Sequence, residues 1–290
     1  MPSAPRADEA RALESLLSFW TLSGVEVLYG DTPLDRTVAQ SARSKPAATE
    51  PSRAPAPAAG APPPTPPRTP SRPGVAAPPK PSAVDLEAIA KAQSAAAAAA
   101  SLEDLKAAIA AFDGCPLKAG ARQAVFSRGP YDAPIMAIGE APGADEDAQG
   151  APFVGRAGQL LDNIFAAGGL AGQVFITNTV FWRPPGNRTP TPEEQAVCAP
   201  FVERAIALLR PKLLLIIGGA SAKALLKPTG GILSLRGKWT EWRSSDGAMT
   251  VPALPTLHPS FLLRQPAAKR MAWEDMQLLA ERLADTSRGD

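Results

Sequence analysis

Residues 213–219 read LLLIIGG, and this stretch decides the fold class of the chain. Five consecutive aliphatic side chains leave no polar face, as expected for a strand covered on both sides of a parallel sheet. Three other short apolar runs have the length of strands: 134–139 (PIMAIG), 174–178 (VFITN) and 252–258 (PALPTLH). We therefore predict four main strands.

Helical patterns lie between these runs. Residues 157–167 and 221–226 are predicted to be helical, and a final helix is predicted at about 268–283. A further helix is predicted from Thr191 to about Arg210, because threonine followed by proline and two glutamates is a typical helix start. Strands that alternate with helices predict a three-layer α/β/α sandwich around a four-stranded, mostly parallel sheet.

The N-terminal part of the chain has a different composition. Of the 33 prolines, 14 lie between Pro46 and Pro81. Such a segment buries too little apolar surface to offset the entropy lost on ordering. We predict a small helical segment at 1–43, a disordered Pro/Ala-rich linker at 44–82 and one globular domain at 83–285.

Two segments outside the strand pattern have helical character. Residues 5–23 carry leucines and a tryptophan at helical spacing, so they form either a tag that packs on the protein itself or a docking module for a protein partner. The alanine-rich run at 84–112 predicts two helices. Ser101 is the expected cap of the second helix, with Asp104 at its third position.

Composition restricts the compartment and the partners. A net charge of +2 makes any DNA affinity depend on a local basic patch. Two cysteines, far apart in the sequence, do not predict a disulfide framework. No signal peptide pattern and no apolar stretch near the roughly 18 residues of a membrane span occur. We expect a cytoplasmic monomer without membrane contact. The candidate phosphate-facing cations are Arg183, Arg188, Arg236, Lys238, Arg264, Lys269 and Arg270.

Residues with chemical potential follow the predicted strands. Glu140, Asn178 and His258 each stand at a strand end, where α/β sheets bind their ligands. The turn at 139–143 (GEAPG) is neither a phosphate-binding Walker loop nor a dinucleotide fingerprint, but its glycines allow backbone to approach a ligand closely. Asn178 offers a donor and an acceptor side by side. His258 is the sole histidine, a residue that is more often structural than catalytic.

Four sequence motifs occur together in this chain. They are GEAPG-x-x-E-D at 139–147, PFVG-x-AG-x-LLD at 152–162, N-x-x-x-x-RPPGNR-x-P at 178–190 and HPS-x-LLR at 258–264. In this combination the chain resembles the family 4 uracil-DNA glycosylases over about residues 112–282. The resemblance implies a DNA repair enzyme that hydrolyses the N-glycosidic bond of deoxyuridine, releases uracil and leaves an abasic site. Its expected partner is uracil-containing DNA, bound in a groove at the carboxyl ends of the strands.

The resemblance implies catalytic roles for three residues. His258 is the expected donor to uracil O2, where it would stabilise the negative charge of the departing base. Asn178 is the expected reader of the uracil edge. Glu140 is the candidate helper of the attacking water, because Ala141 stands where another branch of the superfamily has a water-activating aspartate.

The resemblance also implies substrate-binding roles. Phe153 is the expected stacking ring for the extruded base, and Glu146 is expected to crowd uracil C5 and so exclude thymine. Ser260 is expected to touch a phosphate. Leu262 is the predicted wedge that fills the space left by the flipped nucleotide. The loop expected to line the uracil pocket and the abasic sugar consists of Gly139, Glu140, Ala141, Pro142 and Gly143.

The chain departs from the family at an iron–sulfur cluster. Family 4 members typically hold a 4Fe-4S cluster with four cysteines, of which only Cys115 and Cys198 have counterparts here. Phe112 and Trp182 stand at the other two positions. Two thiolates do not supply the usual ligand set. We predict that no cluster is bound, that Phe112 and Trp182 fill its space as a hydrophobic plug, and that the two cysteines remain neighbours.

Two other interpretations compete with the enzyme. The chain could be a non-catalytic protein that binds uracil- or abasic DNA, or an interaction protein whose N-terminal segment recruits it to replication. A superfamily branch that captures its product covalently uses a histidine-containing insertion, whereas His258 is the sole histidine here. Asn178, Phe153 and His258 together favour the enzyme, because a DNA binder without turnover does not require all three.

Overall fold

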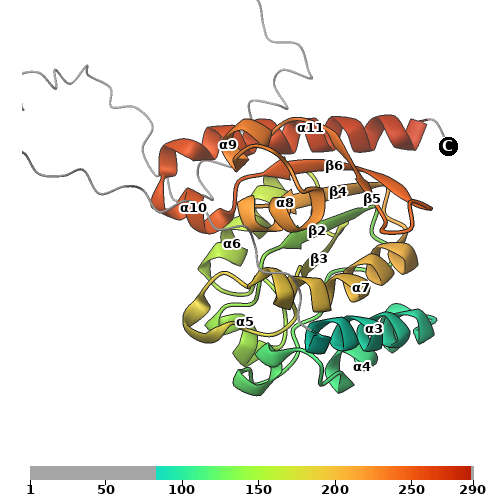
Figure 1. Ribbon diagram of the computed structural model, residues 1–290. Coiled ribbons are helices and arrows are strands. Elements are labelled where there is room, and N and C mark those ends of the chain that lie inside the picture. The colour runs from blue at the N-terminus through green and yellow to red at the C-terminus, as the bar shows by residue number, and fades with distance from the viewer. Residues whose placement is uncertain (1–82, 289–290) are drawn as a thin grey trace, which may run out of the picture. The chain divides into compact units, whose positions relative to one another are not determined.

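The computed structural model describes residues 83–288 of the 290-residue chain. The predicted N-terminal segment at 1–43 and linker at 44–82 lie outside the described residues. The described part alternates helices and strands (Figure 1). Its α-helices are α3 (Ala83–Ala98), α4 (Leu102–Ala111), α5 (Ala144–Gln149), α6 (Arg156–Ala167), α7 (Pro192–Leu209), α8 (Gly219–Leu226), α9 (Ile232–Leu235), α10 (Pro259–Arg264) and α11 (Lys269–Arg288).

Within the described residues, the strands form one six-stranded sheet in the order β1-β3-β2-β4-β6-β5. They are β1 (Ser127–Arg128), β2 (Ile135–Gly139), β3 (Val174–Asn178), β4 (Leu213–Ile217), β5 (Thr240–Arg243) and β6 (Thr250–Thr256). The four inner strands pair in parallel, which confirms the predicted α/β fold. The antiparallel edge strands β1 and β5 were not predicted. Both are short, and β5 buries only its tryptophan, so neither has an apolar run.

The register of the sheet brings the predicted site together. Gly139 at the end of β2 pairs with Asn178 at the end of β3. Across the sheet, Ile217 at the end of β4 pairs with Thr256 at the end of β6. The segments that begin at Glu140 and His258 therefore leave the sheet from the same carboxyl edge, as parallel pairing requires.

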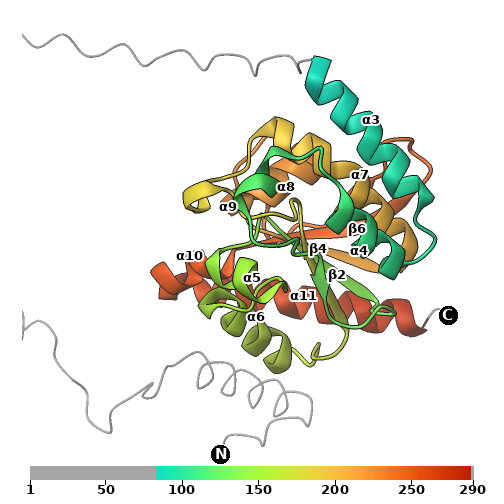
Figure 2. The same cartoon turned by 90° about the horizontal axis from the view of Figure 1, so that it is seen from below.

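Alternate side chains of each strand enter two separate cores. On β2, Met136 packs in a cluster with α3, α4 and α7, and its neighbour Ala137 packs in a cluster with α6 and α11. Figures 1 and 2 show these two groups of helices on opposite faces of the sheet. Burial on both faces explains why the strands read as continuous apolar runs, and each fully buried leucine or isoleucine contributes about 1.5–3 kcal/mol.

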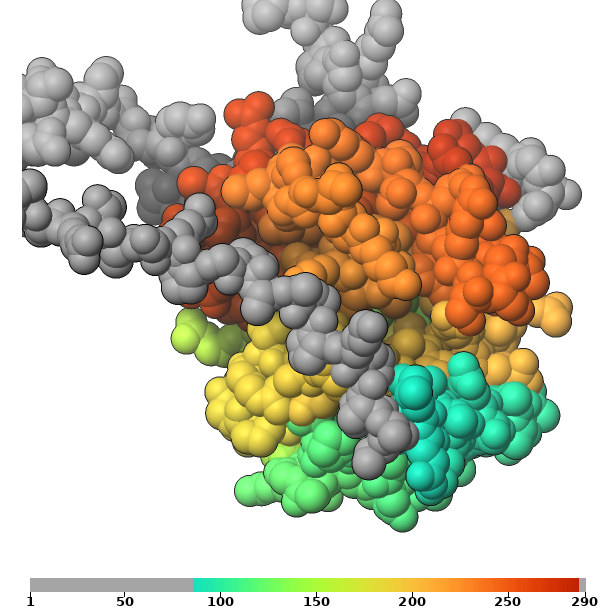
Figure 3. Space-filling model, viewed as in Figure 1, coloured from blue at the N-terminus to red at the C-terminus, as the bar shows by residue number. Residues whose placement is uncertain are grey.

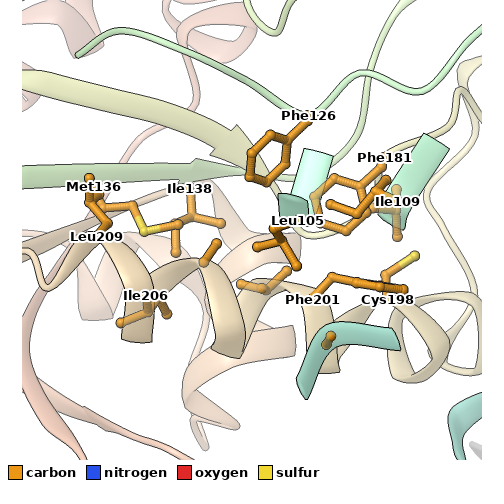
Figure 4. Packing of buried hydrophobic residues seen from close by; sticks show 14 of the residues in the cluster. Leu105, Ile109, Phe126, Met136, Ile138, Phe181, Cys198, Phe201, Ile206 and Leu209 are labelled. Atoms are coloured by element: carbon orange, nitrogen blue, oxygen red, sulfur yellow. The ribbon is translucent and has the colours of Figure 1, made fainter. Parts of the chain in front are cut away.

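The first core contains the two alanine-rich helices. Leu105 and Ile109 of α4 point toward Cys198 and Phe201 of α7 (Figure 4). The predicted cap of α4 is confirmed, because Ser101 and the side chain of Asp104 form a capping box. In the space-filling view, α3 lies below the orange segments that belong to the last third of the chain (Figure 3).

The remaining helices begin close to their predicted positions. Thr191 caps α7 and forms a capping box with Glu194, as the sequence indicated. The final helix extends beyond the predicted end to Arg288. Among the described residues, no helix is both long enough and apolar enough to span a membrane.

Candidate active site

A pocket of about 460 Å³ opens at the carboxyl edge of the sheet. Of the residues predicted for the site, those at 140–143 and Glu146, Phe153, His258 and Ser260 line it. Residues that were not predicted to line it come from the start of α6, the loop after β3 and the end of α10. These are Ala157, Pro184, Asn187, Arg188, Thr189 and Arg264. The RPPGNR motif was the sequence signal for the loop after β3, and its place beside the pocket explains why it accompanies the other motifs.

Asn178 is buried with its hydrogen-bonding capacity unused. Its side chain belongs to a residue that is 1% exposed, and neither Oδ1 nor Nδ2 has a partner among the described residues. A buried polar group without a partner costs about 1–3 kcal/mol. The side chain at the end of β3 therefore has both a free donor and a free acceptor among the described residues.

Gly139 allows the amide and an aromatic ring to meet. A Cβ at this position would lie 2.5 Å from Asn178 Oδ1 and 2.5 Å from Phe153 Cζ. A side chain at position 139 would therefore displace both groups. The absence of a side chain at Gly139 leaves the ring and the amide next to each other.

Phe153 lies in a backbone conformation that is unusual for a residue with a side chain. Its φ is +54°, in the left-handed region. The ring lines the pocket and lies 5.7 Å from the His258 ring, at an interplanar angle of 33°. Strained backbone of this kind is often found at ligand sites. The loop therefore holds an apolar ring between the buried amide and the histidine.

His258 is held as a neutral hydrogen-bond donor. It is the N-cap of α10, and its Nδ1 accepts a hydrogen bond from the Ser260 backbone N–H at 3.2 Å. Burial, together with the charge of Arg264, lowers the pKa of His258 to about 4, and the charge of Glu146 acts in the opposite direction. The ring is therefore neutral at pH 7, and since Nδ1 accepts, its proton is on Nε2.

The carboxylate of Glu146 joins two loops of the site. Its Oε2 accepts from the Gly143 N–H at 3.0 Å, and its Oε1 accepts from the N–H groups of Val154 and Gly155 at 3.0 Å each. Both oxygens are thus bonded to backbone, and the residue still lines the pocket. The predicted contact with uracil C5 stays a prediction, and the side chain has a structural role that sequence reasoning missed.

The predicted wedge residue, Leu262, is buried in the structure. Leu262 is 0% exposed and packs in the core beneath α10, so its side chain does not reach a ligand outside the protein. Leu263, one residue further along the same helix, is 39% exposed. Successive helical residues point about 100° apart, and the pattern LLR did not indicate which leucine faces the core.

The candidate phosphate-facing cations separate into different roles. Arg188 and Arg264 line the pocket. Arg188 also makes two hydrogen bonds to the Glu194 carboxylate, at 2.8 and 2.6 Å. Arg236 is bonded to the buried Asp275, which makes it part of the interior rather than a phosphate-facing residue. Lys269 is buried.

The two cysteines are neighbours, as predicted. A hydrogen bond between the thiols of Cys115 and Cys198 raises the pKa of Cys198, which burial raises further, and the same bond lowers the pKa of Cys115. Phe112 and Trp182 are buried in the same core. There the ring of Phe112 packs edge-on against the ring of Phe201, with 5.1 Å between the ring centroids. Among the described residues, no three His, Cys, Asp or Glu side chains are grouped as metal ligands. These residues do not fit a cluster that requires four thiolates.

Comparisons with known proteins show the family to which this fold belongs. A family model, described as the uracil DNA glycosylase superfamily, matches residues 126–277. The chain is 39% identical to the type-4 uracil-DNA glycosylase of Pyrobaculum aerophilum over 171 residues. These residues make up 57% of this chain and 86% of that protein. The corresponding protein of Thermotoga maritima is 36% identical over 167 residues, or 56% of this chain and 84% of the relative. The corresponding protein of Archaeoglobus fulgidus is 33% identical over 186 residues, or 62% of this chain and 92% of the relative. The chain belongs to the type-4 family of uracil-DNA glycosylases.

Proposed function

We propose that this protein hydrolyses the N-glycosidic bond between uracil and deoxyribose in DNA, releasing uracil and leaving an abasic site for base excision repair. The observation that carries the proposal is the buried amide of Asn178, whose donor and acceptor both lack a partner among the described residues. Relatives that share most of their length with this chain are named type-4 uracil-DNA glycosylases.

Base recognition combines the amide with the neighbouring ring. A base within a duplex is inaccessible, so it must first be extruded, at a cost of about a few kcal/mol. The Asn178 side chain donates to uracil O4 from Nδ2 and accepts from uracil N3–H at Oδ1. Phe153 stacks on the extruded base, which offsets part of the lost base stacking. Cytosine has a donor at C4 and no N3–H, so it does not match this amide orientation.

His258 supplies the stabilisation of the leaving group. As the glycosidic bond breaks, the sugar acquires oxocarbenium character and the base becomes anionic. The neutral Nε2–H of His258 donates to uracil O2, where this charge develops. A preorganised donor of this kind contributes about 2.7–4 kcal/mol to transition-state stabilisation. Because the Ser260 N–H fixes the Nδ1 side of the ring, the donor needs no reorientation during the reaction.

Water attack and DNA binding involve the rim of the pocket. Glu140 lines the pocket and is the proposed helper of the attacking water, while the adjacent Ala141 has no acidic group. Ser260 and Arg264 contact the DNA backbone. Leu263 takes the wedge role, because its exposed side chain can enter the duplex.

We further propose that the reaction proceeds without an iron–sulfur cluster. The two thiols and the buried aromatic residues at the other two positions support this proposal. We also propose that the protein acts as a cytoplasmic monomer and that residues 1–43 form either a tag that packs on the protein itself or a docking segment for a protein partner. Size-exclusion chromatography with light scattering tests the monomeric state, and a mass near twice 30.1 kDa contradicts it.

An oligonucleotide assay tests the proposed function. The purified protein is incubated with a labelled strand that carries one uracil, and alkali then cleaves at abasic sites. We expect uracil-dependent cleavage that is weakened in Asn178→Ala and in His258→Ala, with no cleavage of a thymine-containing control. A folded protein that binds the uracil strand without cleaving it contradicts the proposal and indicates a non-catalytic DNA-binding role.

A further inference from the structure

We propose that Arg128, on the edge strand β1, is a positioning residue that sets the place of the Phe153 ring relative to the Asn178 amide. This inference rests on the proposed function, since the ring and the amide are the groups assigned to the base. Arg128 lies outside the pocket lining, and its predicted effect is transmitted through backbone carbonyls rather than through substrate contact.

The Arg128 guanidinium binds the backbone of the Phe153 loop. Its Nε donates to the Pro152 carbonyl at 2.7 Å, and its Nη2 donates to the Phe153 carbonyl at 3.1 Å. Nη2 also donates to Asp162 Oδ1 at 2.7 Å, which orients the guanidinium from the side of α6. One planar group thus holds two successive carbonyls, an arrangement that a lysine ammonium does not reproduce.

Packing and hydrogen bonds from other residues also fix the backbone around Phe153. Gly158 of α6 packs so closely that a Cβ there would lie 1.6 Å from the Phe153 carbonyl oxygen. Immediately after the ring, the Val154 and Gly155 N–H groups donate to Glu146. The left-handed conformation of Phe153 is unfavourable for an L-residue, so it requires surroundings that hold it. Arg128 supplies the hydrogen bonds on the carbonyl side of this residue.

Arg128 connects this loop to the strand that carries the amide. In the sheet, Arg128 is the partner of Ile176, two residues before Asn178 on β3. The adjacent Thr177 donates from Oγ1 to the Phe126 carbonyl at 2.6 Å, which adds a side-chain bond to this short pairing. Arg128 therefore links β1, and through the pairing with β3 the strand that carries Asn178, to the two carbonyls beside the ring.

A substitution cycle tests the role of Arg128. Arg128→Met keeps much of the aliphatic stem and removes every donor, and it is measured under single-turnover conditions at saturating uracil DNA. We expect the excision rate to fall about 10- to 100-fold, because a displacement of about 1 Å in a reacting geometry has effects of this size. The inhibition constant for free uracil should rise in the same variant, since base binding is then measured without DNA.

The same cycle separates positioning from general stability. In a Phe153→Ala background, Arg128→Met should change the rate by less than about twofold, because Arg128 acts through the missing ring. A loss of equal size in both backgrounds, or a normal rate in the single variant, overturns the inference. Asp162→Asn keeps both carbonyl bonds and should remain within about threefold of the wild type.

Further controls keep the test decisive. Arg243→Met removes an exposed arginine from the other edge strand and should have no effect. If Arg128→Met does not fold, Arg128→Lys replaces it, and a wild-type rate and uracil inhibition constant in that variant overturn the inference. Wild-type protein that leaves uracil DNA intact rejects the proposed function before any variant is compared, so the two failures are distinguishable.

Discussion

In the proposed function, two polar side chains divide the contacts with the base. Asn178 contributes both a donor and an acceptor from a buried strand end, and His258 contributes a donor whose ring nitrogen Nδ1 is already bonded to backbone. Neither residue carries a charge in its active form. A neutral histidine avoids the cost of a charge in a buried site, and its Nε2–H remains available for the anionic leaving group.

The depressed pKa of His258 predicts a pH dependence of stability. The folded ring has a pKa of about 4 and takes up its proton near that pH, whereas the histidine of the unfolded chain has a pKa of 6.5. The unfolded state therefore binds more protons between these values, and the folded state loses stability as the pH falls through this window. We expect a loss of about 3 kcal/mol between pH 7 and pH 4 from this residue alone.

Urea unfolding of the wild type and His258→Asn measures this effect. Asparagine is a good helix cap, so the variant keeps a cap on α10 while removing the titration. Other groups titrate equally in both proteins and cancel in the difference. An identical pH dependence in the two proteins would show that His258 titrates normally.

Adjacent leucines on α10 predict opposite phenotypes. Leu262→Ala should lower the free energy of unfolding by about 2–5 kcal/mol, because it empties a core position. Leu263→Ala should leave stability nearly unchanged and slow uracil excision from duplex DNA about tenfold, as expected if it loses contacts worth about 1.5 kcal/mol. Urea melts and duplex excision rates distinguish the two. Normal duplex activity in Leu263→Ala rules out this wedge.

At the scale of secondary-structure elements, a buried ion pair holds the strand that leads to His258. Asp275 of α11 is 0% exposed and accepts hydrogen bonds from Arg236, which follows α9, and from Thr256 Oγ1 at 2.7 Å. Burial raises the pKa of Asp275, and its bonds to Arg236 and Thr256 oppose this effect. Thr256 ends β6 two residues before His258, so this network joins three elements beneath the site.

Breaking one half of this ion pair should be costly. Asp275→Ala removes the buried ion-pair partner of Arg236, leaves only the half-exposed Glu274 carboxylate at 3.6 Å, and should lower the free energy of unfolding by about 3–5 kcal/mol. Arg236→Met should have a similar effect. The double variant should lose clearly less than the sum of the two, because neither charge remains uncompensated. Additive losses in urea melts would contradict this coupling.

At the scale of the whole molecule, the described domain has a packed hydrophobic core at the positions that correspond to the cluster cysteines of the family. Cys115 and Cys198 remain in contact, and the two aromatic residues that replace cysteines are buried in the same hydrophobic cluster. Large aromatic side chains contribute much of the buried apolar surface of a core. We therefore expect the stability of this region to derive from packing rather than from metal coordination.

The presence of Phe112 and Trp182 at two of the four cysteine positions predicts a colourless enzyme. Freshly purified protein should show no visible absorbance and less than about one iron per chain, whereas a 4Fe-4S protein would be brown. Incubation with an iron chelator should leave both the melting temperature and the excision rate unchanged. Anaerobic purification serves as the control for oxidative loss of a cluster. A brown sample with about four irons per chain would contradict the prediction.

Sequence alone determined the parallel core, the helix starts and the segments that meet at the site. Four continuous apolar runs predicted the inner strands, and strand ends placed Glu140, Asn178 and His258 on one edge. These features depend on local patterns and on the geometry that all parallel sheets share. The motifs added the family, because several loops of one site are recognisable together.

Only the tertiary structure decided the features that depend on contacts between distant segments. It showed that Leu263 rather than Leu262 is exposed, that Glu146 joins two loops, and that Arg128 reaches the Phe153 loop across 25 positions of the chain. It also revealed the short edge strands, which lack an apolar pattern of their own. Such features follow from the packing of elements far apart in the sequence, and local residue patterns do not predict that packing.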